Sequence, residues 1–442
     1  MAPESSQVDL YELGEAWWLL SAEDRLEGFK LLDPQDAEDF FFDLAPRDQG
    51  DLLLALRPAE RRLWYRLLPP DDAADVIQTV EDPEQHAQLL ALLDEATRRE
   101  VTALLAYAED EAGGLMSSRF ARLRPDMTAD EAISYLRKQA LGPIEPETIY
   151  YVYVLDTEQH LMGVVSFREL FSAPGTTRVR DLMSTDVVSA HEAMDQEEVA
   201  RLFAEHDMLA LPVLDAEGRI RGIVTVDDIV DVVEEEATED IQKYGAIEAL
   251  DEPYLRTSLF TLVRKRAGWL SILLVGQMFT VSVIGRFQED IATVAVLALF
   301  IPMIISSGGN SGAQSSTLVI RAMAVGEIRM RDWWRVARRE VATGLALGIL
   351  LGILGLARVL GGQLLGLDEN VAYAMDLGLT IGFSVLGVVL FGTLAGSMLP
   401  FALERLGLDP ASASAPLVAT LMDVTGLLIY FGLASLLLSA LA

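Results

Sequence analysis

The 442-residue chain contains no cysteine, and its four histidines all lie within the first 206 residues. The absence of cysteine excludes disulfides, thiolate metal sites and cysteine nucleophiles. Beyond His206 a soft or borderline metal ion would find neither of its preferred ligands. The stretch "HEAMD" at 191–195 lacks the second histidine of a zinc protease motif. We therefore expect a protein that is not an enzyme.

Positive charge is scarce in the first part of the chain. Residues 1–256 contain 22 Lys and Arg against 56 Asp and Glu, whereas residues 257–442 contain 12 basic and 11 acidic residues. A strongly negative field repels nucleic acid and attracts cations, so we expect metal cations as ligands and no nucleic-acid partner. The N-terminus has no basic region followed by an apolar run. The sequence therefore predicts no cleavable signal peptide and a first half that stays in the cytoplasm.

Prolines recur at nearly constant spacing near the N-terminus, at positions 34, 46, 58, 70 and 83. Proline is favoured in the first turn of a helix, and the apolar residues after each one follow a helical spacing. The pattern predicts short helices that wind into a superhelix over roughly residues 20–115, inside an N-terminal domain of residues 1–120. An irregular helical bundle is the alternative.

A second repeat follows, in which "VLDTEQHLMGVVSFREL" (154–170) aligns without gaps with "VLDAEGRIRGIVTVDDI" (213–229). Each copy is expected to form a strand, a tight turn, a strand and a helix start, with an amphipathic helix upstream. The repeat resembles a tandem pair of cystathionine-β-synthase-type (CBS) modules. We expect an α+β pair of this kind over residues 121–236.

The CBS resemblance implies a nucleotide site. In that family the cleft between the modules often holds ATP or another adenine nucleotide, with a Thr and an Asp at the positions of Thr225 and Asp228. The first copy carries Ser166 and Glu169 instead, so the site is expected at the second copy. The alternative is that Thr225 and Asp228 only cap the helix that starts near Asp227.

Five apolar stretches near the C-terminus are each long enough to cross about 30 Å of hydrocarbon. They cover roughly residues 268–287, 291–320, 341–366, 375–400 and 416–440. We expect a five-helix transmembrane domain of residues 267–442, embedded in a lipid bilayer. An acidic connecting helix of residues 237–266 is expected to join it to the first half.

Basic residues set the expected orientation of these spans. They precede the first span at 264–266 and join the second to the third at 329–339. By the positive-inside rule the first half lies in the cytoplasm and the C-terminus lies outside. We expect a multi-pass protein of the cell's inner membrane.

Polar residues interrupt two of the spans. Asp423 lies seven residues after Pro416, about 10 Å into its span, where a carboxylate is costly without a partner. No basic residue lies at a matching depth, so a bound or passing cation is the simplest partner. In "IPMIISSGGNSGAQSST" (301–317) proline and glycines are expected to loosen the helix beside a water-filled path, which Asn310 would face. A packing seam of small residues is the alternative.

The available ligands favour a hard ion. Carboxylate, amide and carbonyl oxygens suit Mg²⁺, which gives up its waters reluctantly and is expected to pass partly or fully hydrated. Calcium would be expected to recruit more carboxylates. If the protein is a homodimer, two copies of Asp423 can face each other across the two-fold axis.

The whole arrangement resembles the MgtE family of magnesium channels and transporters. The motifs that carry the match are "YAEDEAGGLM" (107–116), "PMIISSGGNSGAQSSTLVIRA" (302–322) and "PLVATLMDVTGLLIYF" (416–431). The resemblance implies Mg²⁺ influx through a homodimer whose ion path lies on the two-fold axis. It implies that Asp423 and the carbonyl of Ala419 contact hydrated Mg²⁺, and that Asn310 lines the path.

The resemblance also implies that cytosolic Mg²⁺ closes the path by bridging acidic residues. The bridging residues implied by motif position are Asp227, Glu248, Asp251 and, near the end of the superhelix, Asp94. Two other functions stay open. One is a membrane-anchored sensor of divalent cations or nucleotides without transport, and the other is a broader transporter that also carries Co²⁺ or Mn²⁺.

Overall fold

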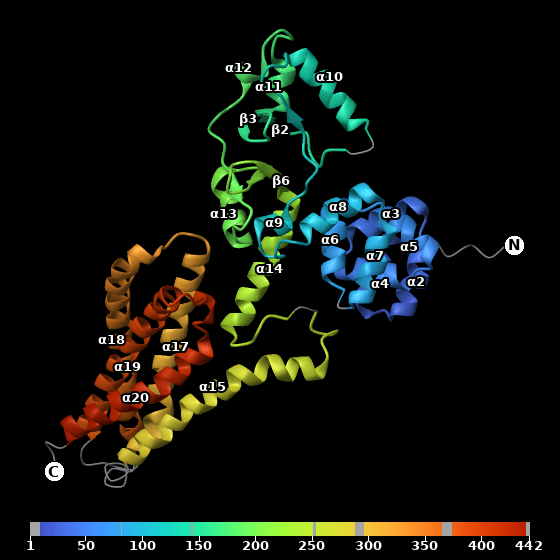
Figure 1. Ribbon diagram of the computed structural model, residues 1–442. Coiled ribbons are helices and arrows are strands. Elements are labelled where there is room, and N and C mark those ends of the chain that lie inside the picture. Colours follow the sequence, from blue (N-terminus) through green and yellow to red (C-terminus); the bar gives the residue numbers. More distant parts are fainter. Residues whose placement is uncertain are drawn as a thin grey trace. The chain divides into compact units, whose positions relative to one another are not determined.

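The computed structural model describes residues 9–80, 82–142, 145–250, 253–287, 296–364 and 374–438. The chain forms two compact units, Met1–Val233 and Glu234–Ala442 (Figure 1). The first unit combines short helices with two small sheets, and the second consists of long helices.

The first unit begins with the predicted stack of short helices. Alternate helices pack on one another, α2 on α4, α4 on α6 and α6 on α8. All five helices that were expected to start at a proline do so, because proline occupies their first turn. The helices are α1 (Leu10–Ala16), α2 (Ala22–Leu31), α3 (Pro34–Asp43), α4 (Pro46–Ala55), α5 (Pro58–Tyr65), α6 (Pro70–Gln78), α7 (Pro83–Leu92) and α8 (Glu95–Leu104).

A buried residue recurs every twelve positions through this stack. The series is Phe29, Phe41, Leu53, Tyr65, Ile77, Leu89 and Val101, and each member is at most 3% exposed. One helix therefore supplies one core side chain at the same place in each unit of the repeat, as expected when short helices bury their faces only by stacking. The Tyr65 hydroxyl donates to the Ala73 carbonyl at 3.0 Å, so the one polar group of the series is satisfied.

Two three-stranded sheets follow and confirm the predicted CBS pair. In each sheet the first strand is parallel to the second, and the second is antiparallel to the third. The strands are β1 (Arg122–Leu123), β2 (Tyr151–Leu155) and β3 (Leu161–Ser166), then β4 (Ala190–His191), β5 (Ala210–Leu214) and β6 (Ile220–Thr225). The helices are α9 (Ala112–Leu115), α10 (Ala129–Ala140), α11 (Phe167–Ser172), α12 (Val179–Leu182) and α13 (Gln196–His206).

The two modules exchange backbone contacts, which explains the glycine shared by both copies of the repeat. Ser117 pairs with Ile223 of the second sheet, and Ser184 pairs with Val164 of the first. A Cβ on Gly222 would lie 2.6 Å from the Ser117 carbonyl oxygen, and the corresponding atom at position 163 would meet Ser184 at 2.6 Å. Only glycine lets these segments approach so closely.

The connector differs from the single helix expected over residues 237–266. Helix α14 (Val226–Tyr244) ends where Ala246 adopts a left-handed conformation with φ of 57°. The next helix, α15 (Leu259–Arg286), begins after Ser258, whose hydroxyl accepts from the Thr261 backbone N–H at 3.1 Å. The acidic run and the first span therefore belong to two separate helices.

The second unit contains the five predicted membrane spans, each a helix long and apolar enough to cross a bilayer. Helix α19 packs against α17, α18 and α20, and α15 packs against α20 (Figure 1). Besides α15 they are α17 (Val296–Ala324), α18 (Trp333–Leu364), α19 (Ala374–Arg405) and α20 (Ala415–Leu438).

Glycines bring the spans into close contact. A Cβ on Gly392 of α19 would lie 2.4 Å from the Gly308 carbonyl oxygen, and one on Gly396 would lie 2.1 Å from that of Gly312. Helix α17 is continuous through Pro302 and these glycines, so the expected loosening is absent. Gly308 and Gly312 instead form the packing seam of small residues that was considered as the alternative.

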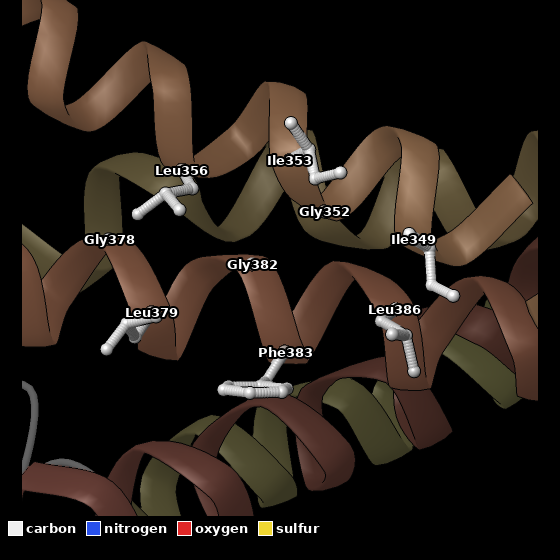
Figure 2. Close-up of a pocket in the computed structure, with 9 residues that line it drawn as sticks. All are labelled: Ile349, Gly352, Ile353, Leu356, Gly378, Leu379, Gly382, Phe383 and Leu386. Atoms are coloured by element: carbon white, nitrogen blue, oxygen red, sulfur yellow. The ribbon is translucent and has the colours of Figure 1, made fainter.

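A shallow groove of about 240 Å³ runs between α18 and α19 (Figure 2). Its nine lining residues are aliphatic, aromatic or glycine, so no group in it would bind an ion. Gly352 and Gly382 let the two helices approach closely here, because a Cβ on Gly352 would be 2.6 Å from the Gly382 carbonyl oxygen. The groove is therefore a feature of the apolar surface.

The Gly392 contact leads to a stability prediction. Gly392→Ala places a methyl group against the backbone of α17, and overpacking of this kind costs roughly 1–3 kcal/mol. We expect a lower unfolding temperature in detergent, measured by calorimetry. Gly432→Ala in α20 is the matched control, because nothing lies within 4 Å of its added Cβ. Equal unfolding temperatures for the two variants would contradict the seam.

Candidate functional sites in the two units

The intramembrane carboxylate of α20 has a hydrogen-bond partner that the sequence analysis did not identify. Asp423 lies eight residues after the start of the helix, about 12 Å along its axis. Gln277 of α15 donates from Nε2 to Asp423 Oδ2 at 2.9 Å. The partner is neutral, so this contact positions the carboxylate without cancelling its charge. A polar amide inside an apolar span was the available signal for Gln277.

Ala419 and Asn310 lie at a nearby crossing of α17 and α20. A Cβ on Gly309 would lie 3.8 Å from the Ala419 Cα, so small residues let the two helices meet there. Asn310 is exposed in the single chain, and its Nδ2 donates to Ser306 Oγ at 3.4 Å. Ala419 precedes Asp423 by one helical turn and shares its side of α20. The helix crossing therefore groups the three residues that were expected to form the ion path.

The last turn of α14 is hydrogen-bonded to α17. The Tyr244 hydroxyl donates to the Ala313 carbonyl at 3.0 Å and shares a hydrogen bond with Thr317. Lys243 forms an ion pair of 2.6 Å with Asp409, in the turn between α19 and α20, and a second pair with Glu239. Ala313 is only three residues from Asn310, so this contact, here called the latch, lies about one turn from the expected path.

The first unit contains a second acidic site, here called the acid cluster. Its members come from α6, from the start of α14 and from the segment before β2, and their carboxylates lie close enough to repel one another. The cluster consists of Asp71, Asp72, Asp75, Glu147, Asp227 and Asp228. Sequence analysis named only the two residues of α14, because the others look like any acid of this acidic half.

Burial and mutual repulsion raise the pKa values of Asp72, Asp75, Glu147 and Asp228. Burial is the larger cause, and it raises the pKa of Asp72 to about 7, with Asp71 and Asp228 adding repulsion. The same causes raise the pKa of Asp75 to about 8 and that of Asp228 to about 7. Burial and neighbouring aspartates also raise the pKa of Glu147 to about 7. These groups hold protons near neutral pH.

Few positive or donor groups compensate this charge. The Ser117 hydroxyl and the Arg119 guanidinium lower the pKa of Asp71, but its burial outweighs them and the net pKa is raised. Arg119 also forms an ion pair with Glu100, with 3.4 Å between Nε and Oε2. The Asp71 Oδ1 atom is buried without a hydrogen-bond partner among the described residues. An additional cation would satisfy this site better than the protein does alone.

The acid cluster does not form a ready-made coordination shell. Within the described parts of the chain, no three or more His, Asp or Glu side chains are arranged to hold one metal ion directly. A divalent ion there would act through its waters or after a small rearrangement, which suits Mg²⁺ because it retains several waters.

The remaining residues expected to bind Mg²⁺ lie elsewhere. Asp94 is exposed and caps α8, accepting from the backbone N–H groups of Ala96 at 3.0 Å and Thr97 at 3.1 Å. Those hydrogen bonds lower the pKa of Asp94. Glu248 belongs to the second unit, where its backbone N–H donates to the Lys265 carbonyl at 3.3 Å. Asp251 lies outside the described residues.

Thr225 and Asp228 make the capping interaction considered as the alternative to nucleotide binding. Thr225 Oγ1 donates to Asp228 Oδ2 at 2.7 Å, and Ser166 bonds Glu169 in the same way at 2.7 Å in the first copy. Acidic neighbours surround Asp228, which disfavours a phosphate group there. The opposite cleft between the modules holds a cavity of about 240 Å³. Its lining includes Tyr151, Tyr153, Asp186, His206 and Pro212.

Comparison with known families covers the membrane and soluble parts. Residues 301–433 match the MgtE family model, described as a divalent cation transporter, and residues 8–110 match the MgtE intracellular N domain. Residues 112–175 and 179–235 each match the CBS domain.

Relatives match over nearly the full length. The chain is 44% identical over 437 residues to the magnesium transporter MgtE of Thermus thermophilus, which covers 98% of this chain and 94% of the relative. It is 34% identical to the magnesium transporter MgtE of Enterococcus faecalis, over 97% and 92%. It is also similar to a crystal structure of the cytosolic domain of the Mg²⁺ channel MgtE in complex with ATP. That match has 43% identity and a TM-score of 0.48, covering 52% of this chain and 92% of the other.

The raised pKa values of the acid cluster predict how the first unit responds to pH. A carboxyl with a raised pKa in the folded state binds its proton more tightly there. Its contribution to stability is therefore complete below about pH 4 and is lost as the pH rises through about 7 to 8. In divalent-free buffer the unfolding temperature of a fragment covering residues 1–256 should fall over this window.

Two variants and two salts test this prediction. Millimolar Mg²⁺ should restore the unfolding temperature at high pH with release of protons, whereas NaCl of equal ionic strength should do much less. Asp72→Asn removes a repelling charge and should flatten the pH dependence. Asp94→Asn keeps the cap of α8 and should leave the pH dependence of the unfolding temperature unchanged. An equal effect of NaCl, or an equal effect of the two variants, would contradict a specific cluster.

Proposed function

Since the chain belongs to the MgtE family of divalent cation transporters, which are membrane transporters rather than enzymes, we propose that it carries Mg²⁺ into the cell. The observation that carries the proposal is the carboxylate of Asp423, held in an apolar span by Gln277 and without a described ion pair. A carboxylate is retained at such a depth when a cation uses it. Hydrated Mg²⁺ would contact Asp423 and the carbonyl of Ala419, with Asn310 beside them.

The path is completed by a second copy of the chain. One carboxylate compensates half the charge of a divalent ion, and two copies of Asp423 facing across a two-fold axis would compensate all of it. Asn310 and Ala419 are exposed in the single chain, so a second copy can reach them. The proposed assembly is a homodimer with the first half in the cytoplasm and the C-terminus outside.

Closure is proposed to depend on cytosolic Mg²⁺ at the acid cluster. Helix α14 begins there with Asp227 and Asp228 and ends at the latch with Tyr244, about 25 Å further along the same helix. Divalent ions that relieve the repulsion among the acids would fix the start of α14, and the latch would fix its end on α17. The ion closes its own path because it binds this arrangement more tightly than the open one.

A nucleotide is proposed as a second ligand of the CBS pair. The cavity between β2, β3 and β5 supports it, because the partly exposed ring of Tyr151 offers a face for an adenine. Asp186 can accept from ribose hydroxyls, and His206 can donate. We therefore propose that ATP or another adenine nucleotide binds in this cleft, while Asp228 belongs to the acid cluster and is capped by Thr225.

Mg²⁺ flux into liposomes that contain only this protein tests transport itself. Asp423→Ala should abolish the flux while the protein stays folded, and Asp423→Asn should conduct with poorer discrimination against monovalent ions. Asp376→Ala, at the start of α19, is the matched control and should transport normally. Wild-type flux in the Asp423→Ala variant would favour a sensor without transport. Comparable flux of Mg²⁺, Co²⁺ and Mn²⁺ would favour the broader transporter.

The latch predicts a change in closure rather than in conduction. Tyr244→Phe removes a hydrogen bond to Ala313 and another to Thr317, each worth about 1 kcal/mol. The ratio of open to closed protein should rise roughly tenfold or more, so closure should need a higher internal Mg²⁺ concentration. Tyr254→Phe is the control, since this exposed tyrosine also lies in the connector. An unchanged closing concentration in Tyr244→Phe would place the gate elsewhere.

A further inference from the structure

Helix α18 presents a mixed basic and apolar stripe on its exposed side. Trp334, Arg338, Val341, Leu345 and Ile349 follow one another at intervals of three or four residues and so share one face. The apolar members of the stripe are 42–63% exposed. Val336, on the opposite side of the helix, is buried at 9% exposure, and Ala337, at the edge of the stripe, is buried at 6%.

The positive charge is concentrated at one end of this stripe. Arg338 and Arg339 are exposed, and Arg335 is exposed while bonding Asp332 at 2.8 Å. The nearest carboxylate inside the helix points the other way, because Glu340 accepts from Ser315 of α17 at 2.7 Å. The structure therefore separates the basic side chains from the acidic one.

The rest of the stripe is suited to hydrocarbon. Tryptophan is enriched at the membrane–water interface, and Trp333 and Trp334 are both exposed beside the arginines. From Arg338 to Ile349 the helix rises about 16 Å, close to half of the roughly 30 Å hydrocarbon core. Ile349 lies with Leu386 at one end of the apolar groove between α18 and α19 (Figure 2). A single acyl chain starting at the arginines would therefore end in the groove.

We propose that this face of α18 binds an anionic phospholipid. The guanidinium groups of Arg338 and Arg339 would hold the phosphate, since arginine matches phosphate with paired hydrogen bonds. One acyl chain would lie along Val341 and Leu345 and end against Ile349. An anionic phospholipid fits both parts of this surface, because its phosphate complements the arginines and its acyl chain covers the apolar residues.

Native mass spectrometry of the full-length protein, in detergent and divalent-free buffer, tests the site. Phosphatidylglycerol should bind more tightly than phosphatidylcholine. Each arginine near an anionic surface contributes about a fivefold factor in affinity, so Arg338→Gln with Arg339→Gln should weaken phosphatidylglycerol binding about 25-fold. Phosphatidylcholine binding should not change.

A matched double variant makes the test specific. Arg264→Gln with Arg266→Gln removes two exposed arginines just before the first span and should change phosphatidylglycerol binding less than twofold. Arg338→Lys with Arg339→Lys keeps the charge and should give an intermediate affinity. An equal loss of phosphatidylglycerol affinity in the two double glutamine variants would show a general effect of charge and would overturn the proposed site. Unchanged binding after Arg338 and Arg339 are replaced would assign them to another partner.

Discussion

Repulsion among half-buried carboxylates is the constraint on which the first unit depends. Asp72, Asp75 and Asp228 are brought together by packing that also removes them from water, so each raises the cost of ionising the next. Ionising all three carboxylates should therefore destabilise this part of the first unit, and protons or other cations should stabilise it. A divalent ion is the more effective partner near neutral pH, because it replaces protons that are being lost.

The position of α14 turns this local constraint into a mechanism. Its first turn supplies Asp228 to the acid cluster, and its last turn supplies Tyr244 and Lys243 to the latch on the membrane spans. A helix is stiff over this length, so what fixes one end limits the freedom of the other. Near Asn310 and Ala419, glycines pack the spans tightly, and Gln277 orients Asp423.

Sequence reasoning succeeded where the signal is local. The helices that begin at Pro34, Pro46 and Pro58 follow from proline chemistry, and the five spans follow from length and hydropathy. It failed where the outcome depends on tertiary contacts. The break after Tyr244, the packing role of Gly308 and the gathering of Asp72 with Asp228 depend on neighbours far apart in the sequence. The roles of Asp423, Asn310 and Ala419 stay predictions that rest on family resemblance and on their common helix crossing.

The most direct test of the coupling uses the absence of cysteine from the natural chain. Tyr244→Cys and Thr317→Cys, introduced together, would let a short cleavable thiol cross-linker replace the latch covalently. Mg²⁺ flux into liposomes should then stop even when no internal Mg²⁺ is present, and cleavage of the cross-link should restore it. Undiminished flux through the cross-linked protein would contradict the claim that α14 closes the path.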